Sequence, residues 1–278
     1  SADPENEYFC DGLAEELLNA LSHIDGLKVA AGTSTFSFKG KVANVGEIGR
    51  KLGVRTILEG SVQKAGNRVR ISVQLSNASD GYHLWSERYD RELKDIFDIQ
   101  DEISLAVVDA LKLTLLGSGR SKMLKHYTDN AEAYSLYLRG RFFWNKRTTE
   151  GTRKAIELYE QAITLDPNYA LAYSGIADCY NSSGFAYDLG SMPAAEVTAK
   201  AKSSAKKALE LDDTLAEAHT SLAYAKHLFD WDWEGAEVCF RRALELNPNY
   251  ANARHWFAHL LIATGRMDEA LAESERGL

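Results

Sequence analysis

Three stretches of this chain are near-copies of one another. QAITLDPNYALAYSG starts at Gln161, KALELDDTLAEAHTS at Lys207 and RALELNPNYANARHW at Arg242. Each carries the end of a helical pattern, and two of the three then place a proline, Pro167 or Pro248, which cannot continue a helix. A segment that recurs in this way predicts a row of similar structural units that share one core.

Each repeated unit is predicted to be a pair of helices. Before Pro248, Ala236, Phe240 and Ala243 recur at steps of four and three residues, which places them on one face of a helix. The preceding segment AEAHTSLAYAKHLF has the pattern of a second helix. Antiparallel helix pairs of about 34 residues in tandem are typical of tetratricopeptide repeats. The chain resembles that family, with the first helix of each repeat expected to begin near Ala131, Ala170, Ala216 and Ala251.

The resemblance sets the expected domain layout. Residues 1–116 are predicted to form an α/β domain, residues 117–129 a linker that contains the glycine-rich GSGRSK, and residues 130–278 about four repeats. The last repeat is expected to be truncated, and an insertion is expected at 182–193. The fold class is therefore an α/β domain, with a mixed sheet and packed helices, followed by an all-α superhelix.

The resemblance also implies a concave groove, lined by the first helix of each repeat, that holds a peptide or a partner helix. The positions that face such a groove in the family are Ser135, Arg139, Phe142, Ser174, Asp178, Asn181, Thr220, Tyr224, His227, His255, His259 and Ile262. His255 and His259 are one turn apart, a spacing compatible with a metal pair, but no third ligand is apparent. A polar groove wall and a contact with a further repeat are the alternatives for these two residues.

The first part of the chain has a different pattern of apolar residues. Leu13, Leu17, Leu21 and Ile24 form one helical stripe, with Asp11 as the expected cap. A strand is predicted at 26–36, a short helix at 44–53 and a long helix at 95–115. Between the last two, alternating residues in RTILEGSVQKAGNRVRISVQLSNASDGYHLWSERYDR predict three strands, joined by turns at Gly66-Asn67 and Asp80-Gly81.

This order of elements carries a second resemblance. DPENEYFCDGLAEELLNAL, FKGKVANVGEIGRKLGVRTILEGSVQKAGNRVRISVQL and GYHLWSERYDRELKDIFDIQDEI are similar to the TolB amino-terminal-like domain. In bacterial regulators, class III nucleotide cyclases and protein kinases, this domain precedes tetratricopeptide repeats in the non-catalytic, carboxy-terminal half. The family's domain opens with an apolar strand that is not found here, and we expect another element to fill or blunt the vacant position in the sheet.

Composition and motifs disfavour several classes of function. Net charge is −8, and acidic residues outnumber basic ones in both halves, which disfavours direct nucleic-acid binding. No apolar run approaches the roughly 18 residues of a membrane span, so membrane attachment is expected only through an upstream segment. The three cysteines, Cys10, Cys179 and Cys239, form neither a metal motif nor a disulfide framework. No nucleophile–base set or phosphate loop is found, and no cofactor is predicted.

Two readings of function remain. The first is a non-catalytic interaction and sensory module that binds a protein or peptide in the groove, and a homodimer is compatible with it. The second is the regulatory half of an enzyme such as a class III adenylate cyclase, with a small ligand at the junction of the two domains. The absence of a catalytic set favours the first. The compartment, cytoplasm or periplasm, stays open.

Overall fold

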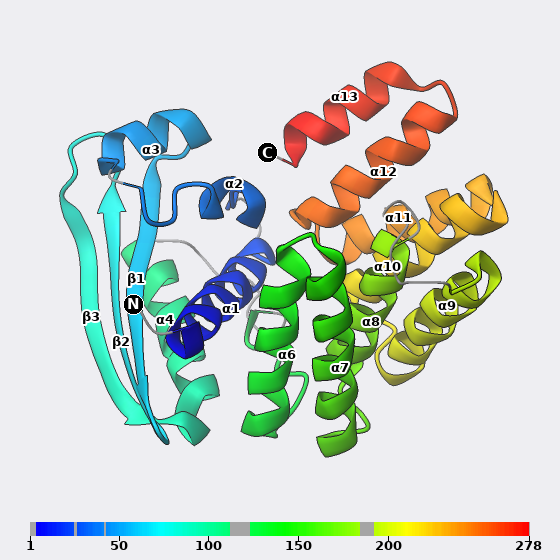
Figure 1. Ribbon diagram of the computed structural model, residues 1–278. Coiled ribbons are helices and arrows are strands. Elements are labelled where there is room, and N and C mark those ends of the chain that lie inside the picture. Colours follow the sequence, from blue (N-terminus) through cyan, green and yellow to red (C-terminus); the bar gives the residue numbers. More distant parts are fainter. Residues whose placement is uncertain (1–3, 25–26, 42, 112–122, 184–191, 278) are drawn as a thin grey trace. The chain divides into compact units, whose positions relative to one another are not determined.

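The protein divides into two compact units, Ser1–His126 and Tyr127–Gly277. Its structure is a computed structural model that describes residues 4–24, 27–41, 43–111, 123–183 and 192–277. The first unit holds a β-sheet with helices, and the described residues of the second unit form helices alone (Figure 1). The predicted fold class, an α/β domain followed by all-α repeats, is confirmed, but the described sheet is antiparallel throughout rather than mixed, because each strand pairs with the next through a short turn.

Three antiparallel strands form the sheet of the first unit, in the order β1-β2-β3. β1 (Thr56–Ala65) pairs with β2 (Arg68–Asn77) along its whole length, and Ala65 lies opposite Arg68. The connection between them is therefore the predicted two-residue turn. β3 (His83–Glu92) pairs with the other edge of β2 after the predicted turn that contains Asp80 and Gly81.

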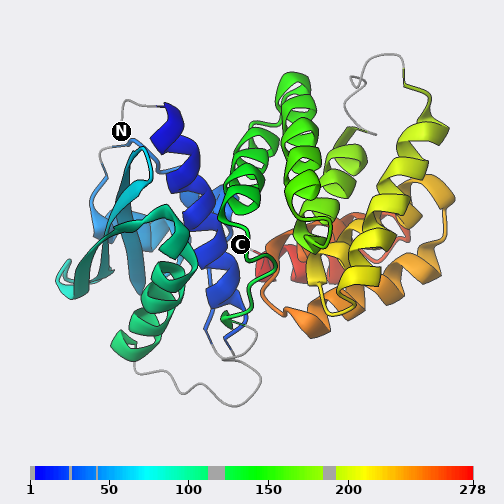
Figure 2. The same cartoon turned by 90° about the horizontal axis from the view of Figure 1, so that it is seen from below.

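One face of this sheet is apolar and covered by helices. Val69, Ile71, Val73 and Leu75 alternate along β2 and are no more than 5% exposed. α1 (Pro4–Ser22) and α4 (Ile96–Ala110) lie on this side of the sheet in both views (Figures 1 and 2). They bury Phe9, Leu13, Leu17, Leu21, Ile99, Ile103 and Val107 against it. Burial of this apolar area is the main force that holds the unit together. The opposite face carries polar side chains.

Two short helices complete the described part of this unit. They are α2 (Gly32–Phe36) and α3 (Val45–Leu52). A 3₁₀ turn at Leu93–Asp95 precedes α4. The Asn44 side chain accepts a hydrogen bond of 2.8 Å from the backbone N–H of Glu47, and Gly53 ends α3 with φ 66°. The predicted helix at 44–53 is thus confirmed, with its start and stop set by the local sequence.

Two local predictions were wrong. Residues 27–31 belong to no strand and residues 32–36 form α2, so the strand predicted at 26–36 does not form. Strand propensity stabilises a strand only when a neighbour completes its hydrogen bonds, and no described strand lies beside this segment. Asp11 lies inside α1 rather than at its cap, and its carboxylate accepts a hydrogen bond of 2.6 Å from Lys39.

The vacant sheet position has no described occupant. Among the described residues the sheet ends on β1 and β3, each ten residues long, and no further strand pairs with either edge. α1 and α3 contact β1, but they leave its backbone edge without a pairing strand. The expectation that another element fills this position is therefore not met within the described part of the unit.

The second unit is a row of helix pairs. The first helices of the pairs begin at the four predicted alanines, which confirms these predicted helix starts. They are α6 (Ala131–Asn145), α8 (Ala170–Ser183), α10 (Ala216–Ala225) and α12 (Ala251–Ala263). The second helices are α7 (Thr149–Leu165), α9 (Ala194–Leu211), α11 (Trp233–Leu246) and α13 (Met267–Arg276). A π-helical turn, Lys226–Asp230, extends α10.

Small residues allow these helices to approach closely. Ala162, Ala208 and Ala243, one from each near-copy, are all 0% exposed. The closest approach involves the Tyr159 ring of α7, which is also fully buried. A Cβ atom added to Gly140 of α6 would lie 2.4 Å from this ring, and one added to Gly175 of α8 would lie 2.7 Å from it. Both glycines are therefore fixed by packing rather than by backbone conformation.

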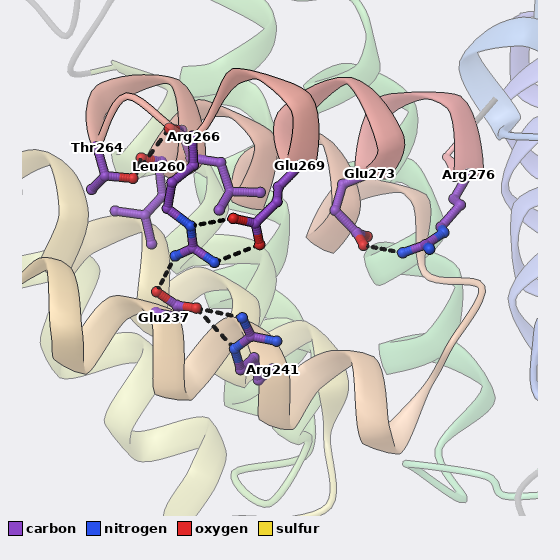
Figure 3. A network of polar contacts seen from close by, with 9 residues as sticks. Glu237, Arg241, Leu260, Thr264, Arg266, Glu269, Glu273 and Arg276 are labelled. Carbon is purple, nitrogen blue, oxygen red and sulfur yellow. Dashed lines mark hydrogen bonds and ion pairs between the residues drawn. The ribbon is translucent and has the colours of Figure 1, made fainter.

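Ion pairs join the last two repeats (Figure 3). The Arg266 guanidinium, just before α13, donates to Glu237 of α11 at 2.6 Å and to Glu269 of α13 at 2.6 and 2.7 Å. Arg241 donates to the same Glu237 carboxylate. These ion pairs hold α13 against α11. α12 also packs against both of these helices.

Several sequence predictions fall on residues that the structure does not describe. Residues 117–122 of the predicted linker and residues 184–191 of the predicted insertion lie outside the described residues. Among the described helices, none has the length and the apolar character needed to cross a bilayer.

Candidate functional site

The first helices of the repeats form one continuous layer of the second unit. α6, α8, α10 and α12 each contact the next helix in this series, while α7, α9 and α11 each pack against the two first helices on either side of them. The layer is therefore the face to which every repeat contributes, and the predicted groove residues all belong to it or to the turn that extends α10 (Figure 1).

The structure separates the predicted groove residues into buried and accessible sets. Five are buried between helices: Ser174, Asp178, Asn181, Thr220 and Tyr224. Ser135, Arg139, Phe142, His227 and His259 are half-buried, whereas His255 and Ile262 are exposed. A ligand on this face would contact the half-buried and exposed residues directly, while the buried residues position the helices that carry them.

Three residues of the buried set, Ser174, Asp178 and Asn181, form a polar cluster with Ser221 and Arg141 between α6, α8 and α10. Ser221 donates a hydrogen bond of 2.5 Å to the Asp178 carboxylate, and its backbone carbonyl accepts one of 2.8 Å from the Asn181 amide. The Ser174 hydroxyl lies 3.4 Å from that of Ser221. Arg141 reaches Asp178 at 3.8 Å from α6. The cluster thus links three successive repeats through one carboxylate.

Burial dominates the electrostatics of this carboxylate. Loss of hydration raises the pKa of Asp178 to about 6, although the positive charge of Arg141 and the hydrogen bond from Ser221 both favour the ionised form. Asp178 is 3% exposed and Arg141 is 8% exposed. Removal of either partner would leave a buried charge uncompensated, which costs more than the pair contributes.

Aromatic rings and histidines form a second cluster at the α10–α12 end of the layer. The ring of Tyr224 stacks on that of Trp256 with centroids 4.3 Å apart and planes 19° apart. His227 and His259 lie 6.2 and 6.3 Å from the same tyrosine ring. His255 packs edge-on against His259 at 4.6 Å. We call these five residues the aromatic–histidine cluster.

The three histidines of this cluster favour their neutral form. Partial burial lowers the pKa of all three imidazoles, the positive charge of Arg147 lowers that of His255 further, and the other two imidazoles lower that of His259 further. Neutral imidazoles both donate and accept hydrogen bonds. Within the described part of the chain, no group of three or more His, Cys, Asp or Glu side chains is placed to hold a metal ion.

Two arginines cover one tryptophan at the other end of the layer. The guanidinium carbons of Arg141 and Arg147 lie 4.6 and 3.8 Å from the ring centroid of Trp144, at distances typical of cation–π contacts. Arg147 follows the end of α6 with φ 52°, a conformation that L-residues adopt at a cost of about 1 kcal/mol or more. The backbone thus holds an exposed guanidinium against a buried indole.

Sequence reasoning missed several residues of these clusters. Arg141, Trp144, Ser221 and Trp256 stand next to predicted positions but were not assigned to the groove. The available signal was chemical: Arg141 is a charged residue on the side of α6 that packs against other helices. Arg147 left no signal, because a positive φ is not expected of arginine.

Comparison with known proteins identifies the repeats. Residues 133–169 and 232–278 each match a family model described as a tetratricopeptide repeat. The chain contains tetratricopeptide repeats. The matched segments cover α6 with α7 and α11 with the helices that follow it, and the remaining tetratricopeptide helix pairs have the same order and packing.

Relatives of the chain include a putative adenylate cyclase and a transcriptional regulator. The chain is 35% identical over 225 residues, which are 81% of its length, to a putative adenylate cyclase 3 of Rhizobium meliloti (strain 1021). It is 27% identical over 143 residues, or 51% of its length, to the transcriptional regulator HilA of Salmonella typhimurium. The chain spans only 38% of the first protein and 25% of the second.

Among solved structures, a tetratricopeptide repeat protein of Thermus thermophilus is 20% identical. The match covers 67% of this chain and 86% of that one, with a TM-score of 0.46. Tetratricopeptide repeats are protein–protein interaction scaffolds without catalytic groups of their own. The second unit is therefore a protein–protein interaction module.

Proposed function

We propose that this chain is the non-catalytic regulatory part of a longer signalling protein, and that its tetratricopeptide repeats bind a peptide segment of a protein partner. The TolB-like assignment of the first unit, still a prediction, is consistent with this role, because that domain accompanies repeats in multidomain regulators. The relatives support the regulatory context, since one is named as a putative adenylate cyclase and another as a transcriptional regulator.

The aromatic–histidine cluster carries the proposal for where the segment binds. It offers the exposed imidazole of His255 and the half-buried imidazoles of His227 and His259. The buried rings of Tyr224 and Trp256 stack on each other and support these imidazoles from inside the helix layer. Side chains that are already held in place lose little conformational entropy when they bind. We assign the anchor point of the peptide to this cluster, and the rest of the predicted groove to its flanking contacts.

The polar cluster supports a rigid binding surface. Asp178, Asn181 and Ser221 are at most 3% exposed and join α8 to α10 by direct hydrogen bonds. A surface whose helices are already fixed loses less conformational entropy when it binds, which favours affinity. These buried residues thus act as positioning residues and do not touch the peptide.

Site-specific photocrosslinking in the native host tests this proposal. A photoreactive benzoylphenylalanine replaces His255 on the proposed surface, and the matched control replaces Arg242, an exposed residue of α11 outside the first-helix layer. We expect one defined protein to crosslink through His255 and not through Arg242, with the crosslinked peptide identified by mass spectrometry. Equal crosslinking from both positions would contradict a specific binding face.

A further inference from the structure

The outer face of the sheet in the first unit contains a polar hollow that the proposed function does not use. Its volume is about 230 Å³, and it is lined by Ser61, Gln63, Arg70, Ser72 and Arg88. The five residues come from all three strands and lie on the face opposite the buried apolar side chains of β2. α1 and α4 cover the other face of the sheet (Figure 1).

The strand register explains why these residues meet. Ser61 of β1 lies opposite Ser72 of β2, which lies opposite Arg88 of β3. In the next row on the same face, Gln63 lies opposite Arg70, and Arg70 opposite Asp90. Directly opposed residues have Cβ atoms about 5 Å apart, so the donors of both rows converge on one small volume.

The lining side chains differ from their neighbours in their hydrogen bonding. Elsewhere on this face the polar groups satisfy one another: Gln74 donates to Glu59, and both Arg68 and Arg70 donate to Asp90. The side chains of Ser61, Gln63, Ser72 and Arg88, by contrast, make no hydrogen bond or ion pair to another described residue. The unused groups are thus concentrated around the hollow.

The charge around the hollow is positive. Arg70 and Arg88 line it and Arg68 lies beside Arg70 on the same face. Arg68 and Arg70 share the carboxylate of Asp90, while Arg88 has no ion pair among the described residues. Glu92, which lies opposite Arg68 on β3, forms an ion pair with Lys94 at 3.1 Å. The two arginines beside Asp90 lower the pKa of its carboxyl group to about 2, so it stays ionised and still balances only one of them. An anion in the hollow would therefore meet uncompensated guanidinium groups.

We propose that this hollow binds the phosphate group of a small phosphorylated molecule. A phosphate presents several strong acceptor oxygens, and guanidinium, hydroxyl and amide donors from three strands match them. Arg88 provides the main ion pair because no carboxylate in the described residues pairs with it, and Ser61, Ser72 and Gln63 donate hydrogen bonds. The hollow is larger than a phosphate, which leaves space for a small organic group attached to it. This site is independent of the peptide-binding surface of the repeats.

The test is a titration of the full 278-residue chain with inorganic phosphate and with glycerol 1-phosphate, at constant ionic strength, followed by calorimetry and by amide NMR. We expect saturable binding that shifts resonances of β1, β2 and β3. Tighter binding of the ester would mean that its organic group occupies the hollow, and tighter binding of inorganic phosphate would mean that the anion alone is the ligand. Both results support the site.

Variants on one strand separate the site from general charge. Arg88→Gln is expected to weaken binding about tenfold or more, as for the loss of one charged hydrogen-bonding group. Arg91→Gln removes the same charge from β3 on its other face and is expected to leave binding within about twofold. Ser72→Ala removes a donor without changing the charge and is expected to weaken binding severalfold. An absence of saturable binding, or equal losses in the two arginine variants, would overturn the proposal.

Discussion

Replacement of Gly140 by alanine tests how the repeats pack. Alanine is the better helix former by about 1 kcal/mol, so a purely local argument predicts that Gly140→Ala stabilises α6. The tertiary structure predicts the opposite. The added methyl group would lie 2.4, 2.7 and 2.8 Å from three atoms of the Tyr159 ring, distances at which something must move.

The ring has no room to move. Tyr159 is 0% exposed, and a Cβ on Gly175 of the neighbouring repeat would also lie only 2.7 Å from it, so two helix backbones hold the ring closely. Overpacking of this kind costs typically about 1–3 kcal/mol, and the upper part of that range applies where no neighbour can yield. After the gain in helix propensity, we expect Gly140→Ala to lower the free energy of unfolding by about 2 kcal/mol.

Urea denaturation followed by far-UV circular dichroism and tryptophan fluorescence provides the measurement. Gly32→Ala is the control, because its added Cβ would lie 3.5 Å from the nearest atom, an ordinary contact, and we expect it to change stability by less than about 0.5 kcal/mol. In a Tyr159→Leu background the cost of Gly140→Ala should largely disappear. A Gly140→Ala protein as stable as the parent, or one equally destabilised without the tyrosine ring, would refute the packing argument.

Two further predictions concern charged groups. The Asp178 carboxyl titrates with a pKa of about 6, above its usual 3.8, so its contribution to stability is full below pH 4 and is lost as the pH rises through 6. Asp178→Asn should reduce the change in the free energy of unfolding between pH 4 and pH 7 by about 3 kcal/mol. A carboxyl ¹³C NMR titration of Asp178 with its midpoint below pH 4 would contradict the assigned pKa. Arg266→Ala, which removes the link between α11 and α13, should lower the thermal midpoint more than Arg242→Ala, which removes only an ion pair within α11. Equal midpoints for the two variants would show that the link does not stabilise the last repeat.

The sequence determined the elements whose signals are local. The periodic apolar pattern set the helix starts at Ala131, Ala170, Ala216 and Ala251, with a proline just before two of them, because period and helix breaks are properties of a few consecutive residues. The alternation along β2 and the Gly66-Asn67 turn likewise fixed the meander. Where a prediction needed a partner from elsewhere in the chain, as for the strand at 26–36, local propensity was not sufficient.

Tertiary structure alone decided which side chains meet. The buried pair of Arg141 and Asp178 joins residues of different repeats, and Ser221, which completes it, lies 43 residues beyond Asp178. The three strands bring Ser61, Ser72 and Arg88 into one row through their register. Such contacts depend on how helices and strands dock, and docking is fixed by burial summed over many distant residues. A short sequence pattern therefore predicts the helices and strands but does not predict how they dock.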